Sequence, residues 1–138
     1  MADPHIQLEV VTPSRQLLSE QVDSIQLPGK DGYLGILPGH APLITQLGIG
    51  VLAYSQSGTP HYATVMEGFA EVLPDRVIVL ADAAELAHEI DPSRAQSAAE
   101  RAEAEIAKST QGATDWHAAS LALQRALARQ EAASKSGS

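Results

Sequence analysis

A group of charged residues around one predicted helix start could bind a phosphate-bearing ligand. Arg94 and Arg101 are seven residues apart, nearly two helical turns, so their guanidinium groups share one helix face. Two arginines can grip a polyphosphate bidentately, and a carboxylate such as Asp91 or Glu85 can accept hydrogen bonds from an adenine amine or a ribose hydroxyl. These residue types at this spacing suit a nucleotide or another polyphosphate.

The same residues also have a purely structural interpretation. Asp91 is a good helix cap, and the two arginines can lie in solvent as helix charges that pair with Glu100 or Glu105. The spacing alone leaves both interpretations open.

Patterns typical of catalysis or metal binding are missing from the chain. The five histidines are scattered without H-x-x-x-H spacing, and no cysteine is present, so we expect no metal site. The sequence contains no Walker loop, no G-x-S-x-G and no G-x-G-x-x-G motif. We therefore expect no catalytic residue and no obligatory cofactor.

Composition narrows the class of protein further. Of the 138 residues 44% are hydrophobic and only five are aromatic, which predicts a folded chain whose core is built from Val, Ile, Leu and Ala. No apolar run approaches the roughly 20 residues of a membrane helix, so we expect no direct membrane insertion. The absence of cysteine excludes disulfides and suits a reducing compartment.

The charge is distributed unevenly along the chain. The net charge is −8, which argues against a nucleic-acid binder because phosphate contacts need Lys and Arg. Residues 1–90 carry three basic and eleven acidic side chains, whereas residues 91–138 carry six of each. The stretch after Trp116 is mildly basic. The two parts of the chain are therefore expected to meet different surfaces.

The pattern of residues changes near Glu89–Asp91. Before this point short apolar segments alternate with Pro and Gly turns, one of them at Glu67-Gly68, which predicts an antiparallel β-sandwich over residues 1–88. The expected strands cover residues 6–11, 22–27, 49–54, 61–66, 69–73 and 76–80. Alanine dominates after Arg94, and residues 89–138 are expected to form a two-helix hairpin, so the fold class is α+β.

The helical part has clear start and stop signals. Asp91 is the expected N-cap with Pro92 at the first helical position, and the first helix should end around residues 109–112. The second helix should run from Thr114 or Asp115 to about Ala133. The predicted apolar faces are Ala95, Ala98, Ala102 and Ile106, and then Trp116, Ala119, Leu123, Ala126 and Leu127. Because most of these side chains are alanines, the hairpin should be weakly held and able to take two positions.

One segment, residues 29–44, carries a family resemblance. Its glycines and prolines predict a turn, a short strand and a second tight turn at Pro38-Gly39. The word L-G-I-x-P-G-H-A-P-L at Leu34–Leu43 closely resembles the signature of the epsilon subunits of F-type ATP synthases (delta in mitochondrial naming). Glu67-Gly68-Phe69 is similar to the family as well, and so is the I-D-x-x-R-A word that begins at Ile90.

The resemblance implies a place in a larger machine. Epsilon subunits are non-catalytic members of the rotating central stalk, peripheral on the cytoplasmic side of the bacterial inner membrane. Their β-domain contacts the gamma subunit and the ring of c subunits. The residues of this chain that match the gamma contact are Pro38, Gly39 and His40, and those that match the c-ring contact are Lys30, Asp31, Gly32 and Tyr33.

The resemblance also implies regulation by the helices. In the family the hairpin can fold down on the β-domain or extend along gamma toward the alpha/beta catalytic head, where it inhibits ATP hydrolysis. Arg125 and Arg129 are the candidates for contact with an acidic segment of beta. Some members bind ATP as a regulatory ligand, and the matching positions here are Glu85, Ile90, Asp91, Arg94, Ala95 and Arg101.

Two other functions stay open beside this one. The chain could be a free-standing nucleotide sensor that uses Asp91, Arg94 and Arg101, or an unrelated β-domain adaptor with a helical tail. Co-purification with gamma and the rest of the complex would distinguish a rotor subunit from both.

Overall fold

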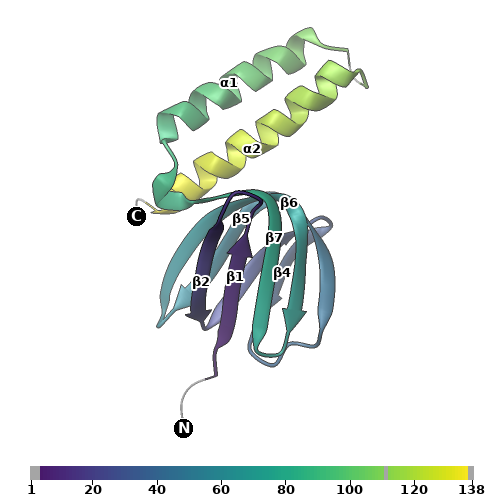
Figure 1. The fold of residues 1–138 in the computed structure, drawn as a ribbon. Coiled ribbons are helices and arrows are strands. Elements are labelled where there is room, and N and C mark those ends of the chain that lie inside the picture. The colour runs from purple at the N-terminus through teal and green to yellow at the C-terminus, as the bar shows by residue number, and fades with distance from the viewer. Residues whose placement is uncertain (1–3, 111, 137–138) are drawn as a thin grey trace.

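A computed structural model describes residues 4–110 and 112–136 of the chain (Figure 1). The order is seven strands, a short 3-10 helix and two α-helices, which confirms the predicted β-sandwich followed by a helical hairpin. The strands are β1 (Ile6–Val11), β2 (Gln16–Val22), β3 (Ser24–Gly29), β4 (Gly32–Ile36), β5 (Leu43–Gln56), β6 (Thr59–Leu73) and β7 (Arg76–Leu86). The helices are η1 (Ala87–Glu89), α1 (Pro92–Lys108) and α2 (Thr114–Ser136).

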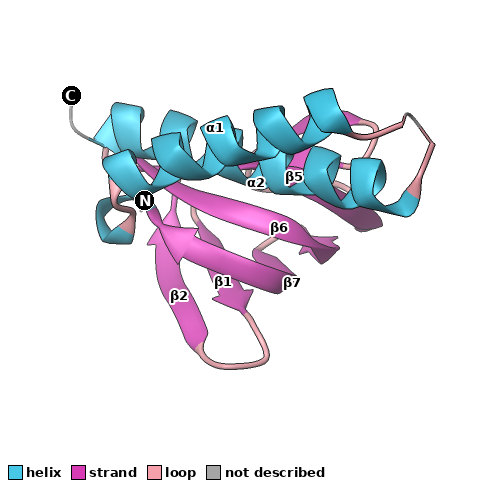
Figure 2. Ribbon diagram, turned by 90° about the horizontal axis from the view of Figure 1, so that it is seen from above, coloured by secondary structure: helices cyan, strands magenta, loops and turns pink. Residues whose placement is uncertain are grey.

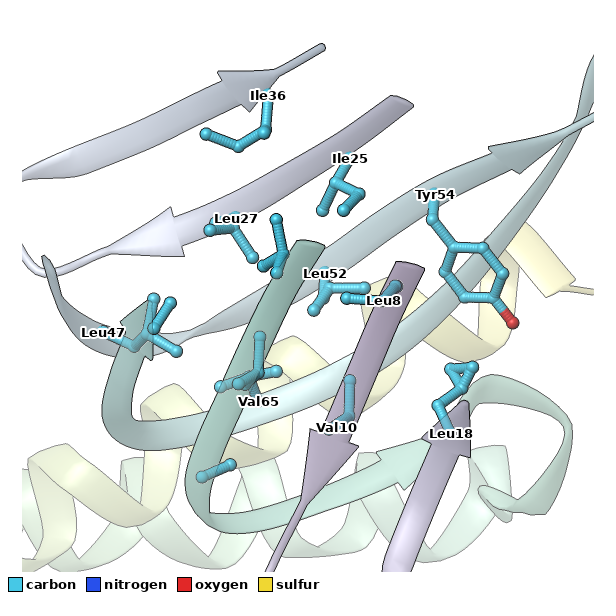
Figure 3. Close-up of a cluster of buried hydrophobic side chains, with 14 of the residues drawn as sticks. Leu8, Val10, Leu18, Ile25, Leu27, Ile36, Leu47, Leu52, Tyr54 and Val65 are labelled. Carbon is cyan, nitrogen blue, oxygen red and sulfur yellow. The ribbon is translucent and has the colours of Figure 1, made fainter. Parts of the chain in front are cut away.

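The strands form one sheet in the order β2-β1-β7-β6-β5-β3-β4. All neighbours are antiparallel except β1 and β7, which are parallel. β1 and β3 are not neighbours in this order, yet Leu8 of β1 and Leu27 of β3 belong to the same buried cluster. The sheet therefore curls so that its two ends face each other across one core, as the inward-pointing side chains in Figure 3 show.

The strand prediction was wrong in several details. β5 begins at Leu43 rather than at residue 49, and β7 continues to Leu86 rather than ending at residue 80. The expected segment 22–27 is split at Asp23 into β2 and β3, and most of β2 was not predicted because its sequence is largely polar. The expected turn at Glu67-Gly68 is a kink inside the continuous strand β6. Glu67 and Gly68 both have positive φ, at 65° and 129°. The chain does not reverse there, because the pairing with β5 and β7 keeps the same register on both sides.

The helices follow their predicted limits but bury somewhat different residues. α2 packs on β5 and β6, whereas α1 packs chiefly on α2 (Figure 2). The buried helical side chains are all alanines: Ala95, Ala99 and Ala102 in α1, and Ala119, Ala126, Ala128 and Ala132 in α2. Ala99 thus takes the place expected for Ala98, and Leu127 is 47% exposed because the buried stripe of α2 follows its alanines.

A small second cluster joins the helices to the β-domain. It consists of Val51, Ala87, Ile90, Ala95 and Ala132, with Tyr62 and Ala133 packed against it. Each buried methyl group contributes only about 0.8 kcal/mol, so this junction is far weaker than the core of the sandwich. Within the described part of the chain, neither helix has the length and apolar character needed to cross a membrane.

Candidate functional site

A cleft of about 590 Å³ lies where the end of β7, the connecting segment 87–91, α1 and α2 meet. We call the segment 87–91, which joins β7 to α1, the hinge. The structure brings the predicted nucleotide-binding residues together here. The cleft is lined by Glu85, Glu89, Ile90, Asp91, Ser93, Arg94, Ala95, Ser97, Ala98, Arg101 and Arg129. All six residues predicted from the charged helix start and the I-D-x-x-R-A word are among them.

Asp91 caps α1 as predicted. Its Oδ1 accepts hydrogen bonds from the backbone N–H of Ser93 (3.0 Å) and of Arg94 (3.3 Å), and from the Ser93 hydroxyl (2.9 Å). These bonds, the one from the Ser93 hydroxyl foremost, lower the pKa of the Asp91 carboxyl below its ordinary value. All three bonds go to Oδ1, and within residues 4–110 and 112–136 no hydrogen bond reaches Oδ2, which is left for a second partner. Capping and ligand binding are therefore compatible in this residue.

Ile90 and Ala95 hold the hinge in place. Both side chains are buried in the second cluster, together with Ala132 of α2. Ile90 anchors the chain between η1 and α1, and the small Ala95 lets the first turn of α1 approach α2 closely. Each named position of the I-D-x-x-R-A word thus has its own role. Ile90 anchors the hinge, Asp91 caps α1, Arg94 places a cation beside the cleft and Ala95 allows close helix packing.

Arg129 enters the cleft from α2. Its Nε donates a hydrogen bond to Oε1 of Glu85 at 2.7 Å, and its Nη2 lies 3.9 Å from the sulfur of Met66. The resemblance pointed to Arg129 only as an inhibitory contact, and no local pattern predicts its pairing with Glu85, which is 44 residues away. This ion pair ties the C-terminal half of α2 to β7.

Arg125 lies along a neighbouring groove between the two helices. The groove has a volume of about 550 Å³ and shares Arg101 and Arg129 with the cleft. Lys108 and Arg125 also line it, together with Glu105 and five alanines. Both residues of the predicted inhibitory pair, Arg125 and Arg129, therefore line the inside of the folded hairpin.

A second ion pair, not expected from the sequence, borders the cleft at the hinge. Arg15 binds Glu89 through two hydrogen bonds, from Nη2 to Oε1 at 2.8 Å and from Nη1 to Oε2 at 3.2 Å. The Leu86 N–H also donates to Oε1, at 3.1 Å. The Arg15 guanidinium and this N–H hold the pKa of the Glu89 carboxyl below its ordinary value.

The residues expected to contact c and gamma lie in two surface turns. Lys30, Asp31 and Gly32 are exposed at the turn between β3 and β4. The Tyr33 hydroxyl accepts a hydrogen bond from the Val51 N–H at 3.1 Å, and Tyr33 shares a small cavity with Lys135 near the end of α2. Tyr33 therefore belongs partly to the surface on which α2 docks.

The second turn begins at Pro38. Gly39 has a φ of 86° and donates its N–H to the carbonyl of Pro74 at 2.7 Å. His40 is half-buried, with its Nδ1 2.7 Å from the carbonyl oxygen of Ala41. This turn leads into β5 and borders the outer surface of the sheet.

An apolar surface, not predicted from the sequence, lies on the solvent side of the sheet. We name it the outer apolar face; its apolar members are Val11, Ile44, Phe69, Ile78 and Leu80, with Phe69 directly opposite Leu80 and Leu80 opposite Val11. Two carboxylates lie on the same side of the sheet, since Glu71 stands between Ile44 and Ile78 and Glu9 is opposite Ile78. Ile44, Phe69 and Leu80 are 71%, 54% and 56% exposed. The unbroken apolar run 77–81 in β7 is a sequence signal for it, because an apolar strand without alternation is typically covered on both faces.

Comparison with known proteins places the chain in a family. Residues 5–87 match the ATP synthase, Delta/Epsilon chain, beta-sandwich domain, and residues 88–134 match the long alpha-helix domain of the same chain. The ATP synthase epsilon chain of Syntrophobacter fumaroxidans is 47% identical over 94% of this chain and 96% of its own. The ATP synthase epsilon chain of Solibacter usitatus is 49% identical over the same shares.

The fold is shared with more distant solved structures. A chain in the cryo-EM structure of the Euglena gracilis mitochondrial ATP synthase (OSCP/F1/c-ring) has a TM-score of 0.80 at 23% identity, covering 97% of this chain and 82% of its own. A chain in the Tetrahymena thermophila mitochondrial ATP synthase central stalk/c-ring structure has a TM-score of 0.58 at 12% identity, covering 96% and 99%. On the strength of both domain matches and these relatives, the chain belongs to the ATP synthase delta/epsilon chain family.

Proposed function

We propose that the chain is a non-catalytic subunit of the central stalk, and that its β-domain links the gamma subunit to the c ring. The outer apolar face carries this proposal. Exposed apolar surfaces of this kind typically mark protein–protein contacts. The turn that contains His40 leads into β5, which carries Ile44 of this face, and turn and face together are the proposed docking surface for gamma. The proposed contact with the c ring is the turn Lys30–Tyr33, and the proposed location of the chain is peripheral, on the cytoplasmic side of the bacterial inner membrane.

The hairpin is the regulatory part of the chain. We divide the chain at the hinge into a β-domain of residues 1–88 and a helical domain of residues 89–138. The contact between them includes alanine methyl groups, a few larger side chains and two partly exposed ion pairs, Glu85–Arg129 and Arg15–Glu89. A contact this weak allows a partner or ligand to shift the hairpin between two positions, because their free energies differ little.

ATP is the regulatory ligand that suits the cleft. Arg94 and Arg101 supply guanidinium groups for the phosphates, and Oδ2 of Asp91 is available to a base or sugar. Among the described residues, no carboxylate lies within 4.0 Å of the Arg94 or Arg101 guanidinium groups. Because α1, α2 and β7 all line the cleft, a ligand bound there favours the folded-down hairpin.

The extended hairpin inhibits ATP hydrolysis by the complex. Arg125 and Arg129 line the groove between the helices and Arg129 is paired with Glu85, so we propose that the inhibitory contact with an acidic segment of beta is made when the hairpin opens. The basic character of the chain after Trp116 favours such a target.

The test is ATP hydrolysis by the whole complex, assembled with the full chain or with a chain that ends at residue 90. The shortened chain should assemble and release hydrolysis, while loss of assembly would contradict the proposed independence of the β-domain. A free-standing sensor or an unrelated adaptor would not co-purify with gamma at all. The double variant Arg125→Ala, Arg129→Ala separates the mechanisms, since charge-based inhibition is relieved and purely steric inhibition is not.

A further inference from the structure

We propose that Arg15, on the turn between β1 and β2, is a positioning residue that makes the cleft receptive to a polyphosphate. It does so by holding and neutralising Glu89 from outside the cleft. The inference rests on the proposed function, in which this cleft binds ATP.

The Arg15–Glu89 contact has a fixed geometry. The Thr12 N–H donates to the carbonyl oxygen of Arg15 at 2.9 Å, and the Arg15 N–H donates to the Thr12 hydroxyl at 3.2 Å. The turn thus fixes the Arg15 backbone, while the two bonds to the carboxylate fix the guanidinium plane. The Leu86 N–H donates to the same Oε1 that accepts from Arg15 Nη2. The turn between β1 and β2 and the end of β7 therefore both hold this carboxylate.

The charges around the cleft make this contact important. Three acids line the cleft, Glu85, Glu89 and Asp91, and so do three arginines, Arg94, Arg101 and Arg129. The lining by itself is therefore electrically neutral, which is a poor environment for a polyphosphate. Arg15 is not part of the lining, yet its charge cancels that of Glu89. With this pair formed, the positive charges of the cleft exceed the negative ones.

The test measures ATP binding to the full chain by titration calorimetry, in four proteins. Arg15→Ala should weaken binding roughly three- to tenfold, since it leaves a bare carboxylate on the cleft wall. Adding Glu89→Gln to this variant should restore binding to within about twofold of wild type, because the repelling charge is gone. Arg76→Ala is the matched control: Arg76 pairs with Glu9 at 3.1 Å and is 48% exposed, the same as Arg15, but lies outside the cleft. It should bind ATP like wild type.

Recovery of ATP binding in the double variant separates the two possible roles of Arg15. The double variant still lacks the ion pair, so ATP binding would stay weak if Arg15 acted only by holding the structure. If wild type binds ATP and Arg15→Ala binds equally well, or if the double variant stays weak, the role of Arg15 is overturned and the nucleotide site stands. If Arg76→Ala weakened ATP binding equally, the loss would depend only on the total charge of the chain, and the role of Arg15 would again be overturned. A wild type that binds no ATP at millimolar concentration overturns the nucleotide site, and the role of Arg15 with it.

Discussion

Arg129 of α2 and Glu85 of β7 form an ion pair, with Nε 2.7 Å from Oε1, at the point where the helical hairpin meets the sheet. The two side chains are 33% and 35% exposed, so solvent screens the attraction without removing it. The pair is also part of the cleft lining. The contact that holds the hairpin down and the cleft proposed to bind ATP therefore share the same residues.

Breaking this pair should loosen the hairpin. Arg129→Gln and Glu85→Gln should each raise the population of the undocked hairpin, and a double-mutant cycle should give a coupling of about 0.5–1 kcal/mol. Because the chain has no cysteine, spin labels on Ser57→Cys and Thr110→Cys report the distance between the domains directly. Arg76→Gln serves as the control for loss of one arginine. A distance distribution that is identical in all variants would contradict a stabilising role.

ATP should stabilise the chain through Arg94. Titrating wild type with ATP should raise its melting temperature, because a ligand that binds only the folded state adds RT ln(1 + [L]/Kd) to its stability. Arg94→Ala should lose most of this shift while keeping the melting temperature of the free protein, since the side chain is exposed. A variant that keeps the full shift would remove Arg94 from the site.

The outer apolar face should bind gamma. Phe69→Ser or Leu80→Ser should weaken assembly with gamma about tenfold or more, because a truncated central apolar contact typically costs over 1 kcal/mol. The folded chain itself should be little affected, since both side chains are more than half exposed. Leu127→Ser is the matched control, a 47% exposed apolar residue on α2. Equal affinity of all three variants for gamma, measured by pull-down or titration, would place the contact elsewhere.

The start of α1 should lose stability in acid. The folded-state pKa of Asp91 is lowered, chiefly by the Ser93 hydroxyl. Its contribution is therefore present above the unfolded pKa of about 3.9 and is lost as the pH falls through the folded value. Asp91→Asn cannot ionise, so the stability difference between wild type and this variant should shrink as the pH falls from 6 to 3. Thermal unfolding of both proteins between pH 6 and 3 measures this difference. A difference that stays constant with pH would contradict a stabilising role for the ionised Asp91 carboxylate.

The kink in β6 should demand glycine at position 68. A Cβ on Gly68 would clash with the carbonyl oxygen of Leu80, and φ is +129°. Gly68→Ala should therefore cost about 3 kcal/mol or more, or prevent folding. Gly58→Ala is the control, because φ is also positive there, at +82°, but nothing lies within 4 Å of the added carbon. This variant should lose only about 1 kcal/mol of unfolding free energy. Similar unfolding free energies for both variants would show that crowding by β7 is unimportant.

The sequence by itself determined the features that depend on near neighbours in the chain. Turn residues and prolines mark the β5–β6 and β6–β7 turns, and Asp91 with Pro92 marks the start of α1, because turns and caps are formed by residues two or three positions apart. Arg94 and Arg101 both line the cleft because residues seven apart lie on one face of a helix, which the sequence alone indicates. Local chemistry also made both a cap and a ligand role for Asp91 conceivable.

Only the tertiary structure decided which distant residues meet. The pairs Arg15–Glu89 and Glu85–Arg129 join residues 74 and 44 positions apart, and neither partner carries a local signal for the other. Glu67-Gly68 has turn chemistry, yet the ladders to β5 and β7 keep the strand continuous. The outer apolar face exists because the register sets Phe69 beside Leu80. Such contacts follow from strand order and helix docking, which depend on burying one shared core rather than on any short stretch of sequence.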